Sequence, residues 1–260
     1  MSGLTQSLLF PDWPAPASVR ACVTTRQGGI SLPPYETFNL GDHVGDDPVA
    51  VAENRRRLSD EFAIQPAWLK QVHGLVVADA NPAVVAEADA SWTGQPGIAC
   101  TVMTADCLPV LFCDRAGTRV AAAHAGWRGL AGGVLEATLD RLALPPEEVL
   151  VWLGPAIGPQ AFEVGLEVRD AFTAVHPEAG RAFVDGARPG KLMADIYELA
   201  RIRLAARGVT AVHGGGLCTV SDERFFSYRR TPQGGRFASL VWLEPRQPVP
   251  ASSRVNPLPQ

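Results

Sequence analysis

The longest apolar run of the chain, Ile98–Cys113, is interrupted by a short polar segment. We interpret Ile98–Met103 and Val110–Cys113 as buried strands, because short apolar runs bounded by turn residues are typical of strands inside a sheet. The segment between them, Thr104–Cys107, predicts a polar elbow. The run is shorter than the ~18 residues of a membrane-spanning helix, and it carries Asp106. It therefore predicts buried sheet structure in the middle of a globular fold, and no membrane span.

Helical and extended patterns lie on both sides of this run. Asp47 and Pro48 predict a helix start, since Asp accepts bonds from the first free N–H groups and Pro is tolerated at the first helical position. We expect this helix to end near Ala63, and a later one to end at Gly208, which suits a left-handed position. The other expected helices are Leu130–Leu142, Val164–Val175 and Lys191–Ala206, and the other expected strands are Arg119–Ala123 and Val149–Leu153.

The C-terminal part predicts a β-hairpin followed by a loose tail. Phe225–Arg230 and Phe237–Leu243 flank the turn residues Thr231–Gly235. Pro245–Gln260 holds five prolines and few apolar residues, which is typical of a loose terminus. Before this tail no linker divides the chain, and strands and helices interleave without the regular alternation of a doubly wound sheet. We therefore expect one mixed α/β domain of the α+β class over residues 1–244.

The charge of the chain excludes several classes of partner. With 23 basic and 27 acidic side chains the formal charge is −4, which gives no electrostatic footprint for nucleic acid or anionic membranes. Prolines directly follow the apolar patch within Met1–Val23, and no Lys precedes it, so we predict no signal peptide. The five cysteines are odd in number and show no framework spacing. Free thiols in a reducing compartment, and thus a cytoplasmic protein, are expected.

Three segments place a metal-capable side chain beside small or sharply turning residues. His73, Cys107 and His124 are 34 and 17 residues apart, so no two of them lie on one turn of one element. A structural zinc site has four ligands, with Cys or His pairs a few residues apart. If these three side chains meet, they form a three-ligand site with an open position, as in catalytic zinc centres, where bound water has a pKa near ~7. A satisfied buried His and an inert buried Cys are the alternative.

The segment His124–Gly129 lies between a predicted strand and a glycine-rich helix start. Free backbone N–H groups near Gly129, with Arg128 beside them, suit phosphate or another anion. The alternative is that the glycines only permit a tight turn and that Arg128 pairs with a carboxylate. Asp106 is a candidate general acid or base, and capping of the following element is its alternative. For His43 we favour a hydrogen-bonded loop role over a place in the same site.

Together these segments resemble the signature blocks of a known family. It is the laccase-domain family, first called polyphenol oxidases and since described as purine nucleoside phosphorylases; one branch is the peptidoglycan editing factor. The match runs in the same order from about Ala21 to Leu243. The matching blocks are Thr25–Ser31, Asn39–Asp46, Asn54–Arg55, Gln71–Gly74, Thr104–Cys107, His124–Gly129, Gly154–Pro159, Phe162–Gly165 and Phe226–Arg230.

The resemblance implies a fold, a metal site and an activity. The family fold is a four-layer sandwich of helices around two β-sheets, similar to that of a toxin deamidase with a Cys–His pair. The family's metal ligands fall on His73, Cys107 and His124, which implies Zn²⁺, with Cu²⁺ as the alternative. The implied activities are phosphorolysis of adenosine, inosine and S-methyl-5′-thioadenosine, and deamination of adenosine to inosine. Departures at Ser91-Trp92 and Gln160-Ala161 lie off the ligand triplet and bear on substrate preference.

Two other enzyme classes stay open at this stage. A copper-dependent phenol oxidase is one, although a multicopper laccase needs more histidines than the five in this chain. The other is a cytosolic hydrolase that edits peptidoglycan precursors, with Cys107 as nucleophile and His124 as base. A thiolate that coordinates zinc is a poor nucleophile, so the two uses of Cys107 compete. For the oligomeric state we expect a monomer or a small homo-oligomer.

Overall fold

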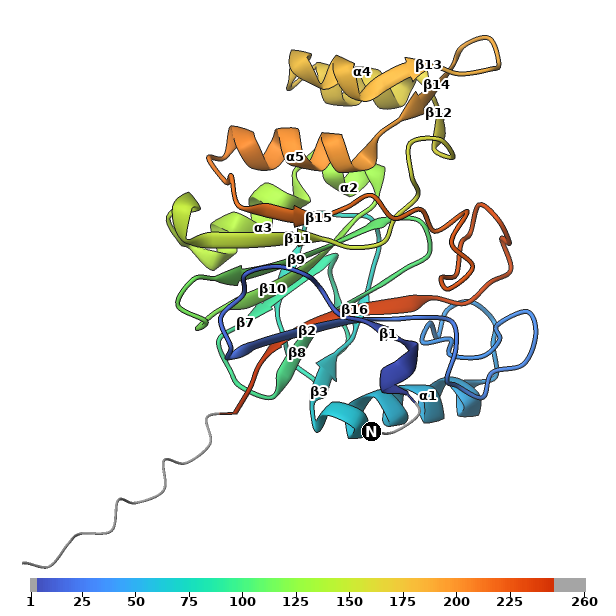
Figure 1. Cartoon of the computed structure of the whole chain (residues 1–260), viewed down its shortest axis with the longest axis vertical. Helices are drawn as coiled ribbons and strands as arrows, with labels where there is room; N and C mark the ends of the chain where they lie inside the picture. Colours follow the sequence, from blue (N-terminus) through green and yellow to red (C-terminus); the bar gives the residue numbers. More distant parts are fainter. Residues whose placement is uncertain (1–3, 246–260) are drawn as a thin grey trace, which may run out of the picture.

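A computed structural model describes residues 4–245, so the predicted tail, apart from Pro245, lies outside the described residues. The described chain is a mixed α+β fold in which two β-sheets lie against each other and helices lie beyond both (Figure 1). Short elements complete it. These are the 3-10 helices η1 (Thr5–Ser7), η2 (Pro146–Glu148) and η3 (Pro177–Ala182) and a strand pair, β4 (Leu69–Lys70) with β6 (Ala86–Glu87).

The five-stranded sheet joins the two ends of the described chain. Its central strand β16 pairs antiparallel with β2 on one side and with β8 on the other. Helix α1 (Pro48–Phe62) lies along its outer face (Figure 1). In spatial order the strands are β1 (Leu8–Leu9), β2 (Val19–Thr24), β16 (Phe237–Leu243), β8 (Ile98–Thr104) and β3 (Gln65–Ala67).

The centre of the six-stranded sheet is deeply buried. β9 and β10 are adjacent and antiparallel at its centre, and every residue of both is buried. In spatial order the strands are β15 (Val212–Gly214), β11 (Val149–Leu153), β9 (Leu108–Asp114), β10 (Val120–Ala125), β7 (Ala90–Thr93) and β5 (Val77–Asp79).

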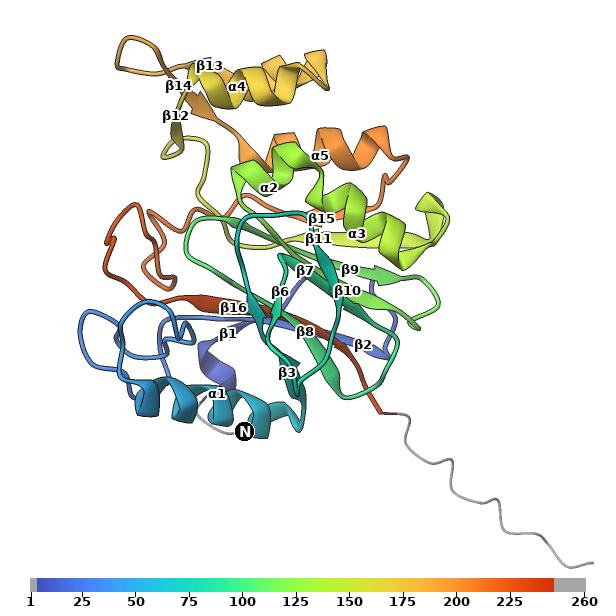
Figure 2. The same ribbon diagram turned by 180° about the vertical axis from the view of Figure 1, so that it is seen from behind.

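Helices and a small sheet cover the far side of the six-stranded sheet (Figure 2). α3 packs against β10 and β7, and α5 packs against α3. The covering elements are α2 (Trp127–Gly132), α3 (Val134–Leu142), α4 (Leu166–Thr173) and α5 (Ile196–Ala206), with the strands β12 (Glu163–Gly165), β14 (Lys191–Ala194) and β13 (Phe183–Asp185).

Within residues 4–245 the buried apolar side chains form three clusters, which we call cores. Leu58 of α1 and Trp242 of β16 belong to the first, and Leu111 of β9 belongs to the second, between the two sheets. Phe112, the next residue of β9, belongs to the third, beneath α3 and α5. Successive strand side chains point to opposite faces, so β9 fills two cores at once. The predicted likeness to a toxin deamidase stays a prediction.

The predicted start of α1 is confirmed in detail. Asp47 is the N-cap, and its Oδ1 accepts a hydrogen bond of 3.0 Å from the N–H of Val49. Pro48 occupies the first helical position, and Ala63 ends the helix in the left-handed conformation. The Asp47 cap therefore sets the start of this helix as the sequence predicts.

Two of the other predicted helices have different bounds. The expected helix Leu130–Leu142 is divided into α2 and α3 by Gly133, whose φ of 107° is incompatible with a continuous helix. The expected helix Lys191–Ala206 begins as strand β14, and the helix itself starts after Asp195, whose carboxylate accepts bonds from two backbone N–H groups.

The expected helix Val164–Val175 and the expected hairpin also need correction. Val164 and Gly165 belong to strand β12, so α4 starts only at Leu166. The hairpin is wrong, because Phe237–Leu243 is strand β16 with a distant partner on each side, and Phe225–Arg230 is an irregular loop. In that loop the guanidinium of Arg230 donates hydrogen bonds to three backbone carbonyls, which take the place of a strand ladder.

No helix within residues 4–245 combines the length and the apolar character that crossing a bilayer requires.

Candidate metal centre

The fold brings together the three side chains that the sequence singles out. His73 follows β4 in a loop, Cys107 lies in the elbow between β8 and β9, and His124 lies in β10. One potential ligand atom from each lies within 4.8 Å of the other two. Among residues 4–245, this is the group of His, Cys, Asp and Glu side chains whose spacing suits a metal ion.

The geometry of this triad suits a tetrahedral ion. Sγ of Cys107 and Nε2 of His73 are 3.7 Å apart, and the two imidazole rings meet edge to face with centroids 4.7 Å apart. Bond lengths of about 2.0–2.3 Å to a tetrahedral zinc ion require ligand atoms roughly 3.5 Å apart. Two imidazoles and one thiolate are a donor set that zinc accepts, and three protein ligands leave a fourth position free. The donor set and its spacing therefore fit the implied metal.

The backbone is unusual at two places in this centre. His73 has a φ of 59° and Asp106 a φ of 96°, although neither residue is glycine. Such conformations cost free energy, and apart from helix ends they cluster at functional sites. The one at Asp106 forms the elbow that the sequence predicts, and places Cys107 at the edge of the sheet.

Asp89, which sequence reasoning missed, supports the metal centre through hydrogen bonds. Its fully buried carboxylate accepts a hydrogen bond of 2.8 Å from Nδ1 of His124. The same carboxylate accepts hydrogen bonds from the backbone N–H groups of Val72, His73 and Gly74, at 3.2, 2.9 and 2.6 Å. One carboxylate thus fixes the imidazole of His124 and the loop that carries His73. With Nδ1 bound to Asp89, Nε2 of His124 is the nitrogen left for a metal.

Charge couples the thiol and the imidazole. Burial on its own raises the pKa of the Cys107 thiol, but His124 and His73 lower it to about 6. Burial likewise lowers the pKa of His124, but the Cys107 thiolate and Asp89 raise it to about 9. Near neutral pH the metal-free pair is therefore a thiolate beside an imidazolium. The thiolate is the form of Cys that binds metals or attacks electrophiles.

Gly126 leaves the space in which the triad meets. A Cβ atom at this position would lie 2.7 Å from Cδ2 of His73 and 3.0 Å from Sγ of Cys107. Its φ of −60° is open to any residue, so the requirement for glycine is steric and not conformational.

We expect Gly126→Ala to displace both side chains and to lower metal affinity at least about 10-fold, the size of effect seen when ligand orientation is lost. The measurement is competition with a coloured chelator. Gly180→Ala is the matched control, because a Cβ there meets only a methyl group at 3.9 Å. Equal metal affinity in both variants would contradict this account of Gly126.

The triad lines a cavity of about 500 Å³. His43, for which we favoured a loop role, also lines it. The wall combines polar and apolar groups, and its remaining members are Gln71, Met103, Thr104, Ala105, Asp106, Trp127, Arg128, Ile157, Phe162, Ile196, Tyr228, Arg229 and Arg236.

The other predicted site residues differ in their surroundings. Oδ1 of Asp106 accepts a hydrogen bond of 2.6 Å from the hydroxyl of Thr219, and Oδ2 accepts one of 2.6 Å from the N–H of Arg229. Arg128 is exposed and lies over the ring of Trp127, 4.4 Å from its centroid. Gly129 is buried within α2, against the carbonyl of Gly74. The structure therefore places Asp106 and Arg128 at the cavity, and Gly129 behind its wall.

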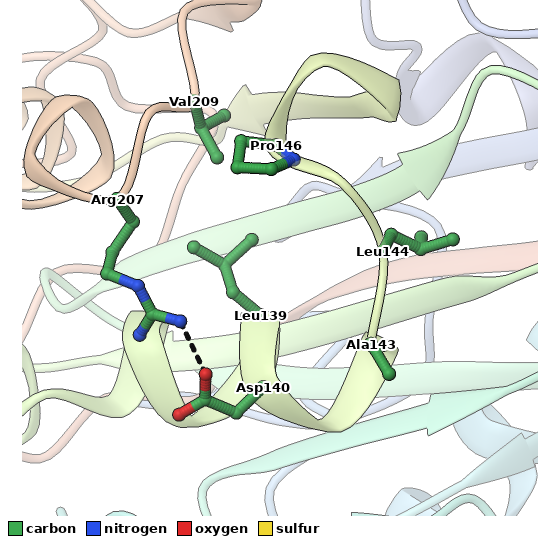
Figure 3. A pocket seen from close by; sticks show the side chains of 7 residues that line it. All are labelled: Leu139, Asp140, Ala143, Leu144, Pro146, Arg207 and Val209. Carbon is green, nitrogen blue, oxygen red and sulfur yellow. Dashed lines mark hydrogen bonds and ion pairs between the residues drawn. The ribbon is translucent and has the colours of Figure 1, made fainter.

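A smaller cavity of about 200 Å³ lies at the C-terminal end of α3 (Figure 3). Leu139, Pro146 and Val209 form its apolar part, and Arg207 pairs with Asp140 at its rim. Since both charged groups at the rim are paired with each other, this cavity offers no free group for chemistry.

Comparison with known proteins decides the family. Residues 20–244 match the family described as multi-copper polyphenol oxidoreductase laccase. The chain belongs to this family. This match confirms the resemblance seen in the sequence. The description of the family names several copper ions, whereas the centre described above offers three potential protein ligands.

Relatives in this family carry the name of another activity. The chain is 70% identical over 237 residues to a purine nucleoside phosphorylase of Pseudomonas aeruginosa, covering 91% of this chain and 98% of that protein. It is 56% identical over 241 residues to the purine nucleoside phosphorylase YfiH of Escherichia coli, covering 91% and 98%.

Solved structures share the fold. A crystal structure of a Neisseria meningitidis protein superposes with a TM-score of 0.89 at 52% identity, covering 92% of this chain and 100% of that one. YlmD of Geobacillus stearothermophilus superposes with a TM-score of 0.82 at 31% identity, covering 88% and 93%.

Proposed function

We propose that this protein is a zinc-dependent purine nucleoside phosphorylase that cleaves adenosine, inosine and S-methyl-5′-thioadenosine to the free base and a ribose 1-phosphate. The observation that carries the proposal is the cluster of His73, Cys107 and His124 in a cavity of about 500 Å³, large enough for a nucleoside. The names of close relatives support the reaction class.

The three ligands would hold the metal with its fourth position toward the cavity. When bound, zinc supplies a Lewis acid there without a change of redox state. The residues of the chain prepare this position: Asp89 keeps Nε2 of His124 free, and His124 and His73 keep Cys107 a thiolate. Small adjustments of the three side chains complete the ligand set, because their potential ligand atoms already lie within 4.8 Å of one another.

Phosphorolysis also requires that phosphate is held against the ribose C1 and that charge on the departing base is stabilised. The sequence indicates Arg128 and the helix start at Gly129 for phosphate binding; of these we keep Arg128 as a cationic contact at the cavity wall, because Gly129 does not line the cavity. Trp127 supports this assignment of Arg128, since stacking on its ring orients the guanidinium at the cavity wall. Apolar wall residues such as Ile157 and Phe162 would exclude water from the base.

Deamination of adenosine to inosine is the second reaction we propose for this site. It requires a group that carries protons to and from C6 of adenine, and Asp106 is our candidate. Its two oxygens accept hydrogen bonds from Thr219 and Arg229, so the same carboxylate also joins the elbow to the loops that surround the cavity.

The test is incubation of the purified protein with adenosine, phosphate and zinc, followed by chromatography of the products. We expect adenine and ribose 1-phosphate to form only when phosphate is present, and inosine to form without it. Inosine supplied in place of adenosine should give hypoxanthine. If none of these products forms while the protein is folded and holds its metal, the proposal is wrong.

One observation favours a second candidate function. The thiolate of Cys107 beside the imidazolium of His124 is the pair that a cysteine hydrolase uses. A peptidoglycan precursor would then be an amide substrate. Mass spectrometry of the metal-free protein with an acylating substrate distinguishes the two, because only the hydrolase forms an adduct on Cys107. Copper in the same three ligands is a further alternative, and metal analysis after purification without added metal decides it.

A further inference from the structure

Arginines without a carboxylate partner gather around the cavity. Arg128, Arg229 and Arg236 all line it, and within residues 4–245 none of the three forms an ion pair with Asp or Glu. Arginines elsewhere, such as Arg55 and Arg203, do pair with carboxylates. Guanidinium groups that gather at a concave surface and have no ion-pair partner attract an anionic ligand.

Arg236 differs from the other two in its surroundings. It is half-buried, and burial lowers the pKa of its guanidinium, against the opposing influence of Cys107, Asp106 and Tyr228. Its Nη1 donates hydrogen bonds of 3.0 Å to the carbonyls of Gly234 and Gly235. In the described chain its Nε and Nη2 have no acceptor. The guanidinium is thus anchored on one side and leaves two donor atoms available for a ligand.

The strand register places Arg236 at the same sheet end as the metal centre. Arg236 directly precedes Phe237, whose Cα partner in β8 is Thr104. Thr104 in turn lies three residues before Cys107, and it also lines the cavity.

Arg229 and Arg128 are less suited to be the main anion contact. Both terminal nitrogens of Arg229 donate to the backbone carbonyls of Ala161 and Glu163, at 3.3 Å each. The Glu163 carboxylate is also near enough for Arg229 to lower its pKa. Arg128 is exposed and stacked on Trp127.

We propose that Arg236 forms an oxyanion subsite of the cavity and that this subsite binds phosphate. The identity of the anion rests on the proposed function, since phosphorolysis consumes phosphate. The subsite lies at the end of the paired strands β8 and β16, whereas Arg128 belongs to α2. Arg128 is then a second, exposed cationic contact at the cavity wall, and Arg236 is the main contact of the anion. The same chemistry would also hold a phosphate group carried on a nucleotide.

The experiment is calorimetric titration of the metal-loaded protein with inorganic phosphate and, separately, with adenosine 5′-monophosphate. We expect Arg236→Gln to weaken phosphate binding about 10- to 100-fold, because a charge-assisted hydrogen-bond pair is lost. Arg236→Lys should recover part of the loss, and metal content should not change. Arg224→Gln is the matched control, since Arg224 pairs with Asp222 and does not line the cavity.

Kinetics supply a second readout. Arg236→Gln should raise the KM for phosphate by the same factor and change the KM for adenosine by less than about 2-fold. Binding that depends on Arg236 but is stronger for the nucleotide assigns the subsite to a substrate-borne phosphate. Phosphate binding that is unchanged in a folded Arg236→Gln protein overturns the subsite. Phosphate binding that depends on Arg236, in a protein that cleaves no nucleoside, overturns the proposed function alone.

Discussion

Replacing Cys107 by Ala is expected to remove both stoichiometric metal and purine nucleoside turnover. The change deletes one of three ligands, and it also deletes the thiolate that raises the pKa of His124. Two imidazoles with no anionic ligand hold zinc much more weakly, so we expect turnover to fall by more than the ~10- to 100-fold typical of losing a residue that only orients a ligand. Metal content by mass spectrometry and the rate of adenine release from adenosine measure the two effects.

The matched control is Cys218→Ala. Cys218 is also a half-buried thiol, but it lies outside the triad, where its sulfur accepts a hydrogen bond from the N–H of Gly158. This control should keep its metal and its activity. Full phosphorolysis by a Cys107→Ala protein that has been shown to be metal-free would exclude the metal-based function and leave only the arginine side of the cavity to explain the activity.

Much of this centre could be predicted from local sequence. His73, Cys107 and His124 each lie beside residues that permit a sharp turn, and that pattern together with the family resemblance was enough to select them. Their approach to one another depends on the pairing of β9 with β10, which places Cys107 next to the strand that carries His124. The spacing of residues within a single strand or helix does not reveal that pairing.

Sequence analysis did not identify Asp89 and Arg236, because both reach the site through contacts between segments that are distant in the chain. Asp89 follows an ordinary stretch of small residues, and Arg236 follows a glycine turn, so neither has a local pattern that marks it. Arg236 becomes part of the cavity only because β16 pairs with β8, a strand more than a hundred residues away. The same long-range pairing explains why the predicted hairpin was wrong, since both edges of β16 are occupied by distant strands.

The predicted helix boundaries were wrong for a different physical reason. Apolar spacing in Lys191–Ala206 fits a helix, but β14 gains hydrogen bonds to β12 and β13 on both sides, and this tertiary pairing outweighs helical propensity. At α1 no such competitor exists among the described strands, so the Asp47 cap and the apolar stripe together determine the element.

Replacing Asp89 by Ala is expected to have the largest effect on stability. The change leaves the buried imidazolium of His124 without its carboxylate and leaves three backbone N–H groups without an acceptor. Removing one partner of a buried charge pair typically lowers the free energy of unfolding by about 3–5 kcal/mol. Metal affinity should also fall about 10- to 100-fold, because nothing then holds Nε2 of His124 toward the ligand position. Denaturant unfolding and chelator competition measure the two effects.

Asp89→Asn separates the orienting role from simple packing. Asn keeps the volume and one oxygen of Asp89, but its amide nitrogen would face N–H donors, so the loop at His73 should lose support while the core stays filled. We expect an intermediate loss of stability with nearly the full loss of metal affinity. Asp79→Asn is the control, because Asp79 pairs with Arg141 at the surface, where an ion pair contributes at most about 1 kcal/mol. If Asp89→Asn bound metal as tightly as Asp79→Asn, Asp89 would be a structural carboxylate only, and the orientation of His124 would have to come from the strand itself.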